Sequence, residues 1–178
     1  QKLSDLIEAR FNIYADSTMS SYSGMKCLNI DESAAFRNVY NGGDVLVVLR
    51  YVKGQVKYQL IDGQHVRSPQ GGTDFNPQIC ENGNRIMNGV EMDSNGTHIA
   101  YHIQDAQLGW KRIMCKSKQT GLTIAYLVGG LEYRLDYSRS FPLFSGLFEI
   151  VKTLERYSDA TLTSAEEQNK NAYQVVSE

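Results

Sequence analysis

Cysteine, proline, histidine and tryptophan are all scarce in this 178-residue chain, which has three cysteines, three prolines, three histidines and one tryptophan. The cysteines are Cys27, Cys80 and Cys115. They are odd in number and too far apart for a local zinc motif, so the sequence indicates neither a disulfide framework nor a zinc site. We interpret them as reduced thiols of an intracellular protein.

An excess of basic charge and long apolar runs are also missing. Lysine and arginine number 18 against 20 acidic residues, a net charge of −2, which argues against a surface that holds nucleic acid by neutralising many phosphates. No apolar run approaches the roughly 18 to 20 residues of a membrane-spanning helix, and the first ten residues are amphipathic rather than typical of a signal peptide. We therefore expect no membrane partner.

The remaining composition is that of a folded domain. With 42% hydrophobic and 21% charged residues, a chain of this length can bury a core of ordinary size in one domain. Because the sequence begins at Gln1 rather than at a methionine, we expect it to be a piece of a longer protein.

Helical periodicity occurs at both ends of the chain. Apolar side chains at helical spacing predict a helix over residues 3–16. A second helix is predicted to begin at Asp31, whose carboxylate can cap free amide groups, and to end at Gly42 and Gly43. The longest periodic segment begins after Pro142. Its apolar stripe thins beyond Tyr157, so we expect a long helix that projects from the domain or packs on a neighbour.

Strand patterns fill the middle of the chain. Residues 45–52 and 55–61 predict a hairpin around Lys53-Gly54, and residues 68–84 form an irregular loop. A second hairpin is predicted around Asn95-Gly96, a pair typical of a tight type I′ turn. Further strands are predicted at residues 110–116, 122–128 and 131–137. The predicted fold is α+β, with antiparallel hairpin-rich sheets, packed helices and a long projecting C-terminal helix.

Residues able to do chemistry are few. His98 and His102 lie on one predicted strand, where side chains four apart stand roughly 13 Å from each other, too far to share a metal ion. Asp62 and His65 are an acid and a possible general base near a strand end, although such pairs are more often surface pairs. The chain has no Walker loop, dinucleotide fingerprint or paired-carboxylate motif, so we expect no cofactor and no metal.

Three sequence blocks, in order, resemble a known family. Residues 38–69 contain a helix end followed by Gly-Asp-Val-Leu-Val, a hairpin, and Ile-Asp with a valine four residues after the aspartate. Residues 85–103 read Arg-Ile-Met-Asn-Gly-Val-Glu, then an Asp-x-x-Gly turn and Ala-Tyr-His-Ile. Residues 137–165 lead from Arg-Ser-Phe-Pro into a long helix containing Lys-Thr-Leu-Glu-Arg-Tyr-Ser-Asp-Ala. Together they resemble the lambda-type portal protein family of tailed bacteriophages. Ser140 stands where that family usually has glycine, and residues 104–136 match poorly.

The resemblance implies a structural protein rather than an enzyme. Portal subunits form a closed ring of about twelve copies at one capsid vertex. Double-stranded DNA is packaged through this ring by a separate terminase and later ejected, and the ring is the head-tail attachment point. The implied partners are copies of the chain itself, the DNA, terminase, and capsid and head-tail adaptor proteins. The implied location is the virion, and the bacterial host cytoplasm during assembly.

The resemblance also divides the chain. Residues 1–139 correspond to a portal wing-like α+β domain and residues 140–178 to the start of the stem helix, within a subunit longer than this chain. For contact with DNA or with neighbouring subunits, we expect one helix face to be used. It carries Lys152, Arg156, Glu166, Glu167 and Lys170. The alternative is that these residues form an ordinary solvated face.

Two other hypotheses stay open from the sequence. One is a small intracellular enzyme that uses Asp62 and His65, which would require both side chains to converge in a pocket. The other is a small α+β binding or sensor module whose final helix leads into a partner. A buried cavity lined by the hairpins would favour it, and a solid core would count against it.

Overall fold

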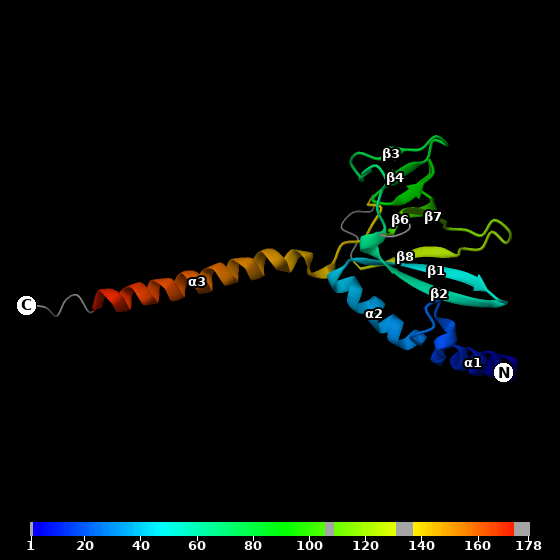
Figure 1. Ribbon diagram of the computed structural model, residues 1–178, viewed down its shortest axis with the longest axis horizontal. Helices are drawn as coiled ribbons and strands as arrows, with labels where there is room; N and C mark the ends of the chain where they lie inside the picture. The colour runs from blue at the N-terminus through cyan, green and yellow to red at the C-terminus, as the bar shows by residue number, and fades with distance from the viewer. Residues whose placement is uncertain (1, 106–108, 131–136, 173–178) are drawn as a thin grey trace, which may run out of the picture. The chain divides into compact units, whose positions relative to one another are not determined.

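The computed structural model describes residues 2–105, 109–130 and 137–172, with side chains as far as Asn169. The chain divides into two compact units, Gln1–Leu143 and Phe144–Glu178. Among the described residues, the first unit contains two α-helices and two antiparallel sheets, and the second is built on one long helix, α3. The fold is therefore α+β, as predicted (Figure 1).

The first unit begins with helices α1 (Lys2–Asp16) and α2 (Leu28–Asn41). The prediction for α1 is confirmed. The predicted start of α2 at Asp31 is wrong by three residues, because the Asp31 amide already donates to the Cys27 carbonyl within the first turn. The Asp31 carboxylate instead accepts a hydrogen bond from the Tyr58 hydroxyl at 3.0 Å, which ties the helix to the sheet beneath it.

Sheet A has the strand order β2-β1-β8, with β1 Asp44–Val52, β2 Gln55–Asp62 and β8 Ala125–Gly129. The predicted β1–β2 hairpin is confirmed. Lys53 and Gly54 both have positive φ, as a two-residue type I′ turn requires. Strand β8 begins three residues later than predicted, because Ser117 and Leu122 close a turn before it.

Sheet B has the strand order β3-β4-β5-β6-β7. The strands are β3 Gln78–Ile79, β4 Arg85–Met87, β5 Val90–Met92, β6 His98–Asp105 and β7 Gly109–Met114. Strands β5, β6 and β7 confirm three predicted segments. The loop predicted over residues 68–84 is irregular except for the two residues of β3. The strand predicted at residues 131–137 lies, except for its last residue, outside the described residues.

The predicted type I′ turn at Asn95-Gly96 is wrong. Asn95 does not have positive φ, and residues 93–97 form a wider loop in which Asp93 Oδ1 accepts from the Asn95 and Thr97 amides at 2.9 and 2.8 Å. The tight turn of this kind lies instead between β4 and β5, where Asn88 and Gly89 have φ of 49° and 87°. The aspartate explains the difference, because its side chain can satisfy the amides of the wider loop.

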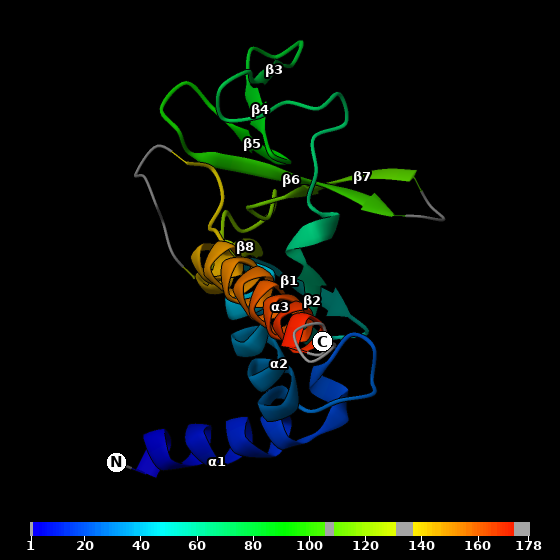
Figure 2. The same cartoon turned by 90° about the vertical axis from the view of Figure 1, so that its left-hand side faces the viewer.

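The core lies between the two sheets. Sheet A contributes Leu46, Val48 and Ala125 from the face that looks toward sheet B. Sheet B and the adjoining segments contribute Val66, Val90, Met92, Tyr101, Ile103, Ile113 and Cys115. The opposite face of sheet A looks toward α1 and α2, so this sheet is the middle layer of the first unit (Figures 1 and 2).

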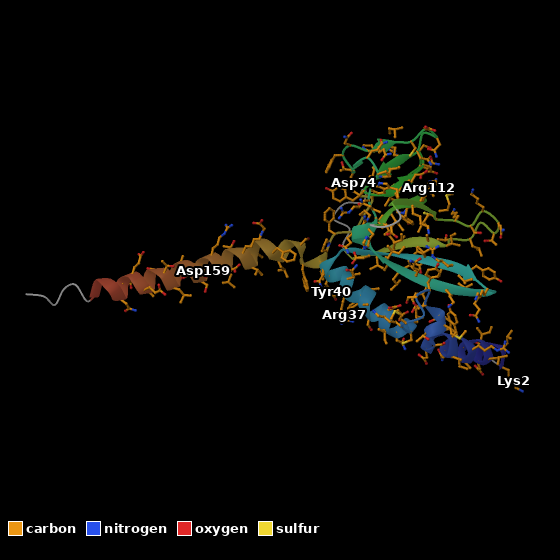
Figure 3. The ribbon with its side chains drawn as sticks, viewed as in Figure 1. Lys2, Arg37, Tyr40, Asp74, Arg112 and Asp159 are labelled. Carbon is orange, nitrogen blue, oxygen red and sulfur yellow. The ribbon has the colours of Figure 1, made fainter. Side chains whose placement is uncertain are left out.

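The second unit consists of helix α3 (Leu147–Ala172), which follows a short 3-10 turn at Leu143–Gly146. The prediction of a long C-terminal helix is confirmed. Every described side chain from Leu147 to Asn169 is exposed. Figure 3 shows these side chains standing out around the circumference of the helix. The described part of the chain has no helix long and apolar enough to cross a membrane.

Candidate assembly surface

Helix α3 has two chemically distinct faces. At 3.6 residues per turn, Leu147, Ile150, Val151, Leu154 and Tyr157 fall within a sector of about 120°. Their side chains are 50–70% exposed, which is unusual for an apolar stripe of this length. A stripe of this kind normally packs on another element, so α3 has an apolar face that the described residues of its own unit leave uncovered.

The four described members of the predicted charged face lie together on the opposite side. Lys152, Arg156, Glu166 and Glu167 fall within a sector of about 100° that is centred away from the apolar stripe, and all four are exposed. Lys170 lies in α3, but its side chain is outside the described ones. The helix therefore brings these residues to one face. Contact with DNA or with another subunit stays a prediction.

The two units differ in charge. Residues 1–143 contain 15 basic and 14 acidic residues, whereas residues 144–178 contain three basic and six acidic residues. The acidic excess of the chain thus lies wholly in the unit that contains α3. A polyanion would be repelled by this unit rather than held by it.

The Arg139 side chain makes five hydrogen bonds, and it lies just before the turn that leads to α3. Its Nε donates to Asp44 Oδ2 at 2.5 Å, and one terminal nitrogen donates to Asp44 Oδ1. The other donors reach the carbonyl oxygens of Gly63, Val66 and Asn88 at 2.8, 2.8 and 3.1 Å. These bonds use all five donors of the guanidinium.

The surroundings of this ion pair leave little space. The Asp44 side chain is 1% exposed and the Arg139 side chain 16%. A Cβ atom at position 63 would collide with the Asp44 carboxylate and the Arg139 guanidinium, so only glycine fits there. The neighbouring Ser138 donates from its amide and hydroxyl to Asp74 Oδ1 at 3.0 and 2.6 Å. The chain segment that leads toward α3 is therefore fastened to β1 and to the loops of both sheets.

A second buried carboxylate, Glu91 on β5, organises sheet B. Arg112 on β7, labelled in Figure 3, makes a bidentate pair with it at 2.6 and 2.8 Å. The Asn84 amide and the His102 ring contact the same carboxylate at 2.7 and 3.1 Å. The Arg112 guanidinium is the main cause that lowers the pKa of Glu91 to about 2, with help from Asn84 and His102 and against the opposing effect of burial.

We expect Glu91 to make the fold sensitive to acid. Because its pKa is lower in the folded than in the unfolded protein, its contribution to stability is complete above about pH 4.5 and is lost as the pH falls toward 2. A shift of this size corresponds to about 3 kcal/mol. Urea unfolding between pH 6 and 2.5 measures this, and Glu91→Gln should flatten the decline while the exposed-site variant Glu81→Gln keeps it. Equal slopes in Glu91→Gln and the unsubstituted protein would contradict the assignment.

The residues of the enzyme hypothesis do not form a site. Asp62 and His65 are both exposed, and no hydrogen bond joins them. Asp62 Oδ1 instead accepts from the Gln64 amide at 2.9 Å and caps the short 3-10 helix Gly63–His65. Within the described residues, no group of three His, Cys, Asp or Glu side chains is arranged to hold a metal ion.

Comparison with known proteins identifies the family. The family model described as "Phage portal protein, lambda family" matches residues 1–178. The chain belongs to the lambda family of phage portal proteins. A search of curated proteins finds no match. The resemblance of the three blocks is thereby confirmed, and the chain is a phage portal protein of a structural rather than an enzymatic family.

The three portal-like blocks meet at Arg139. Asp44 and Gly63 come from the first block, Asn88 from the second and Arg139 from the third. The Arg-Ser-Phe-Pro motif predicts only the entry into the long helix, and the sequence does not indicate this ion pair. The available signal was Asp44, an acidic residue that directly precedes the apolar run 45–49.

Proposed function

We propose that this chain provides the wing and the start of the stem of a phage portal subunit, with residues 1–139 as the wing and residues 140–178 as the stem. The family match over residues 1–178 carries the proposal. In this function, about twelve subunits close into a ring at one capsid vertex. Terminase packages double-stranded DNA through the ring, the DNA later leaves through it, and head-tail adaptor proteins attach there. The ring itself catalyses no reaction.

The exposed faces of α3 support the proposal that the subunits form a ring. An uncovered apolar stripe opposite a charged face suits a helix that packs on neighbouring subunits with one side and faces an aqueous channel with the other. We assign the charged face with Lys152, Arg156, Glu166 and Glu167 to the channel, together with Lys170. The acidic excess of residues 144–178 fits a wall that lets DNA slide without holding it.

Weak DNA binding is the property to test. The full-length protein should bind a short duplex less tightly than ordinary non-specific binders, which have dissociation constants of about 1 to 100 µM at physiological salt. Replacing Glu166 and Glu167 by lysine should tighten binding at least about tenfold and steepen its salt dependence, because each subunit then presents more cations to the phosphates. Fluorescence anisotropy at two salt concentrations measures both.

The matched control changes the same number of charges elsewhere. Asp5→Lys combined with Glu81→Lys alters two exposed sites of the first unit and should leave DNA affinity within about threefold of the unsubstituted protein. An equal increase in DNA affinity in this control would show that the increase comes from the total charge of the protein rather than from the charges of α3. An unsubstituted protein that already binds DNA as tightly as the Glu166→Lys, Glu167→Lys variant would contradict the conduit function.

A further inference from the structure

An open apolar groove lies in the first unit, between α1, α2 and the helix side of sheet A. Its volume is about 950 Å³. Aromatic and aliphatic side chains make up most of its walls, including Phe11, Phe36, Val47, Leu49, Val56 and Tyr126. The β1–β2 hairpin forms part of its wall, but the groove is open rather than buried, and it therefore differs from the buried cavity expected of a sensor module.

The strand register explains why this face of sheet A is apolar. Alternation along β1 sends Leu46 and Val48 to the core and Val47 and Leu49 to the groove. The sheet is thus apolar on both faces, as in a middle layer that is covered on both sides. The two helices cover only part of the second face.

Side chains that the helices leave uncovered are large. Val56 and Tyr126 are 51% and 43% exposed, and Phe36 on α2 is 63% exposed. The patch continues along α1 from Phe11, because Leu3, Leu6 and Ile7 lie on the same side of that helix and are exposed too. Clustered exposed apolar side chains of this kind are typical of a protein interface.

The same chain carries a surface of the opposite shape. The apolar stripe of α3 is convex, and its five side chains are uncovered within the described residues. A ring built from identical copies requires two different complementary patches on each copy, because its contacts are head-to-tail. A groove and a helix stripe meet this requirement, and binding of an amphipathic helix in an apolar groove is a common mode of recognition.

The charges in the groove wall favour the first half of α3 as the segment that binds there. Asp31 and Glu32 lie in the wall of the groove. The second half of α3 carries Asp159, Glu166 and Glu167, which these carboxylates would repel. In contrast, the segment 147–157 contains two basic and two acidic residues and is neutral. It also contains the whole apolar stripe defined above.

We propose that the groove of one copy receives residues 147–157 of α3 from the next copy in the ring. The occupant is therefore a second copy of this chain. The inference rests on the proposed portal function, since it locates a subunit contact within the ring. The contact would cover exposed apolar side chains on both surfaces: five of the stripe and, in the groove, Phe11, Phe36, Val56, Tyr126 and Val128.

Cross-linking of the full-length protein tests the contact. Phe36→Cys in the groove and Leu154→Cys in the stripe are combined with Cys27→Ser and Cys80→Ser, while the buried Cys115 is kept. A short bismaleimide should then link neighbouring subunits covalently, which gives a ladder of dimers, trimers and higher multiples of the subunit on a denaturing gel. The matched control replaces Phe36→Cys with Ile30→Cys, which lies on the opposite side of α2 and should give no ladder.

Each result of this experiment bears on the inference. A ladder with Phe36→Cys and none with the Ile30→Cys control supports it. Intact rings without a ladder, or a cross-link that leaves the chain at monomer mass, would overturn the inference and leave the portal function standing. The absence of any ring in the uncross-linked protein would overturn both.

A second variant measures the strength of the contact. Phe36→Asp should weaken ring formation about 30-fold or more, because a charge replaces an apolar anchor. Its unfolding midpoint should stay unchanged, because the Phe36 side chain is already exposed. The control Ile30→Asp makes the same chemical change on the other side of the helix and should assemble normally. Equal assembly of the Phe36→Asp and Ile30→Asp variants would overturn the inference.

Discussion

Replacing Arg139 by alanine should lower the free energy of unfolding by about 3 to 5 kcal/mol, the loss typical when one partner of a buried ion pair is removed. The Asp44 carboxylate would remain buried without its counter-ion. The carbonyl oxygens of Gly63, Val66 and Asn88 would lose their donor at the same time. Urea unfolding followed by circular dichroism measures the change.

The matched control for this prediction is Arg67→Ala. The Arg67 side chain is exposed and makes one hydrogen bond, to the Gln64 carbonyl at 2.7 Å, so its loss should change stability by less than about 0.5 kcal/mol. Combining Asp44→Ala with Arg139→Ala should be less destabilising than the sum of the single changes, since neither charge is then left alone. A loss below about 1 kcal/mol for Arg139→Ala would contradict the role assigned to this ion pair.

Replacing Leu154 by aspartate should abolish ring assembly while the chain still folds. The side chain is 67% exposed in the single subunit, so the substitution creates no cavity and no buried charge within the chain. In the proposed ring, by contrast, the apolar stripe would be buried, and an unpaired carboxylate there is strongly unfavourable. We expect each subunit contact to weaken at least about 100-fold, which a closed ring repeats at every interface.

Mass photometry of the full-length variant measures this loss, and thermal unfolding verifies that the fold is kept. The matched control is Thr163→Asp, an exposed position of α3 on the face opposite the stripe, which should assemble like the unsubstituted protein. Normal rings from Leu154→Asp would show that the stripe is not an interface. Loss of rings in both variants would point to helix stability rather than to the stripe.

Local sequence patterns predicted most of the elements, because helix and strand periodicity is a property of neighbouring residues. Helix α1, the β1–β2 hairpin and strands β5 to β7 follow directly from the spacing of apolar side chains. The mispredicted type I′ turn lies where a side chain competes with the backbone. The carboxylate of Asp93 stabilises a wider loop, so the tight turn occurs at Asn88-Gly89 rather than at Asn95-Gly96.

Contacts between distant segments could not be predicted from local pattern. Asp44 and Arg139 are 95 residues apart, and Glu91 and Arg112 are 21 apart on different strands. The resemblance to the portal family covers the segments of Asp44 and Arg139 but does not indicate that they meet in an ion pair. The groove could not be predicted from the sequence either, because its apolar residues alternate along the strands in the same way as core residues do.

The central claim is that this chain is part of a ring-forming portal subunit. Mass photometry of the full-length protein at micromolar concentration, together with negative-stain microscopy of the same sample, tests it most directly. We predict closed rings of one size, with a mass of about twelve subunits. A protein that stays strictly monomeric under these conditions would contradict the account.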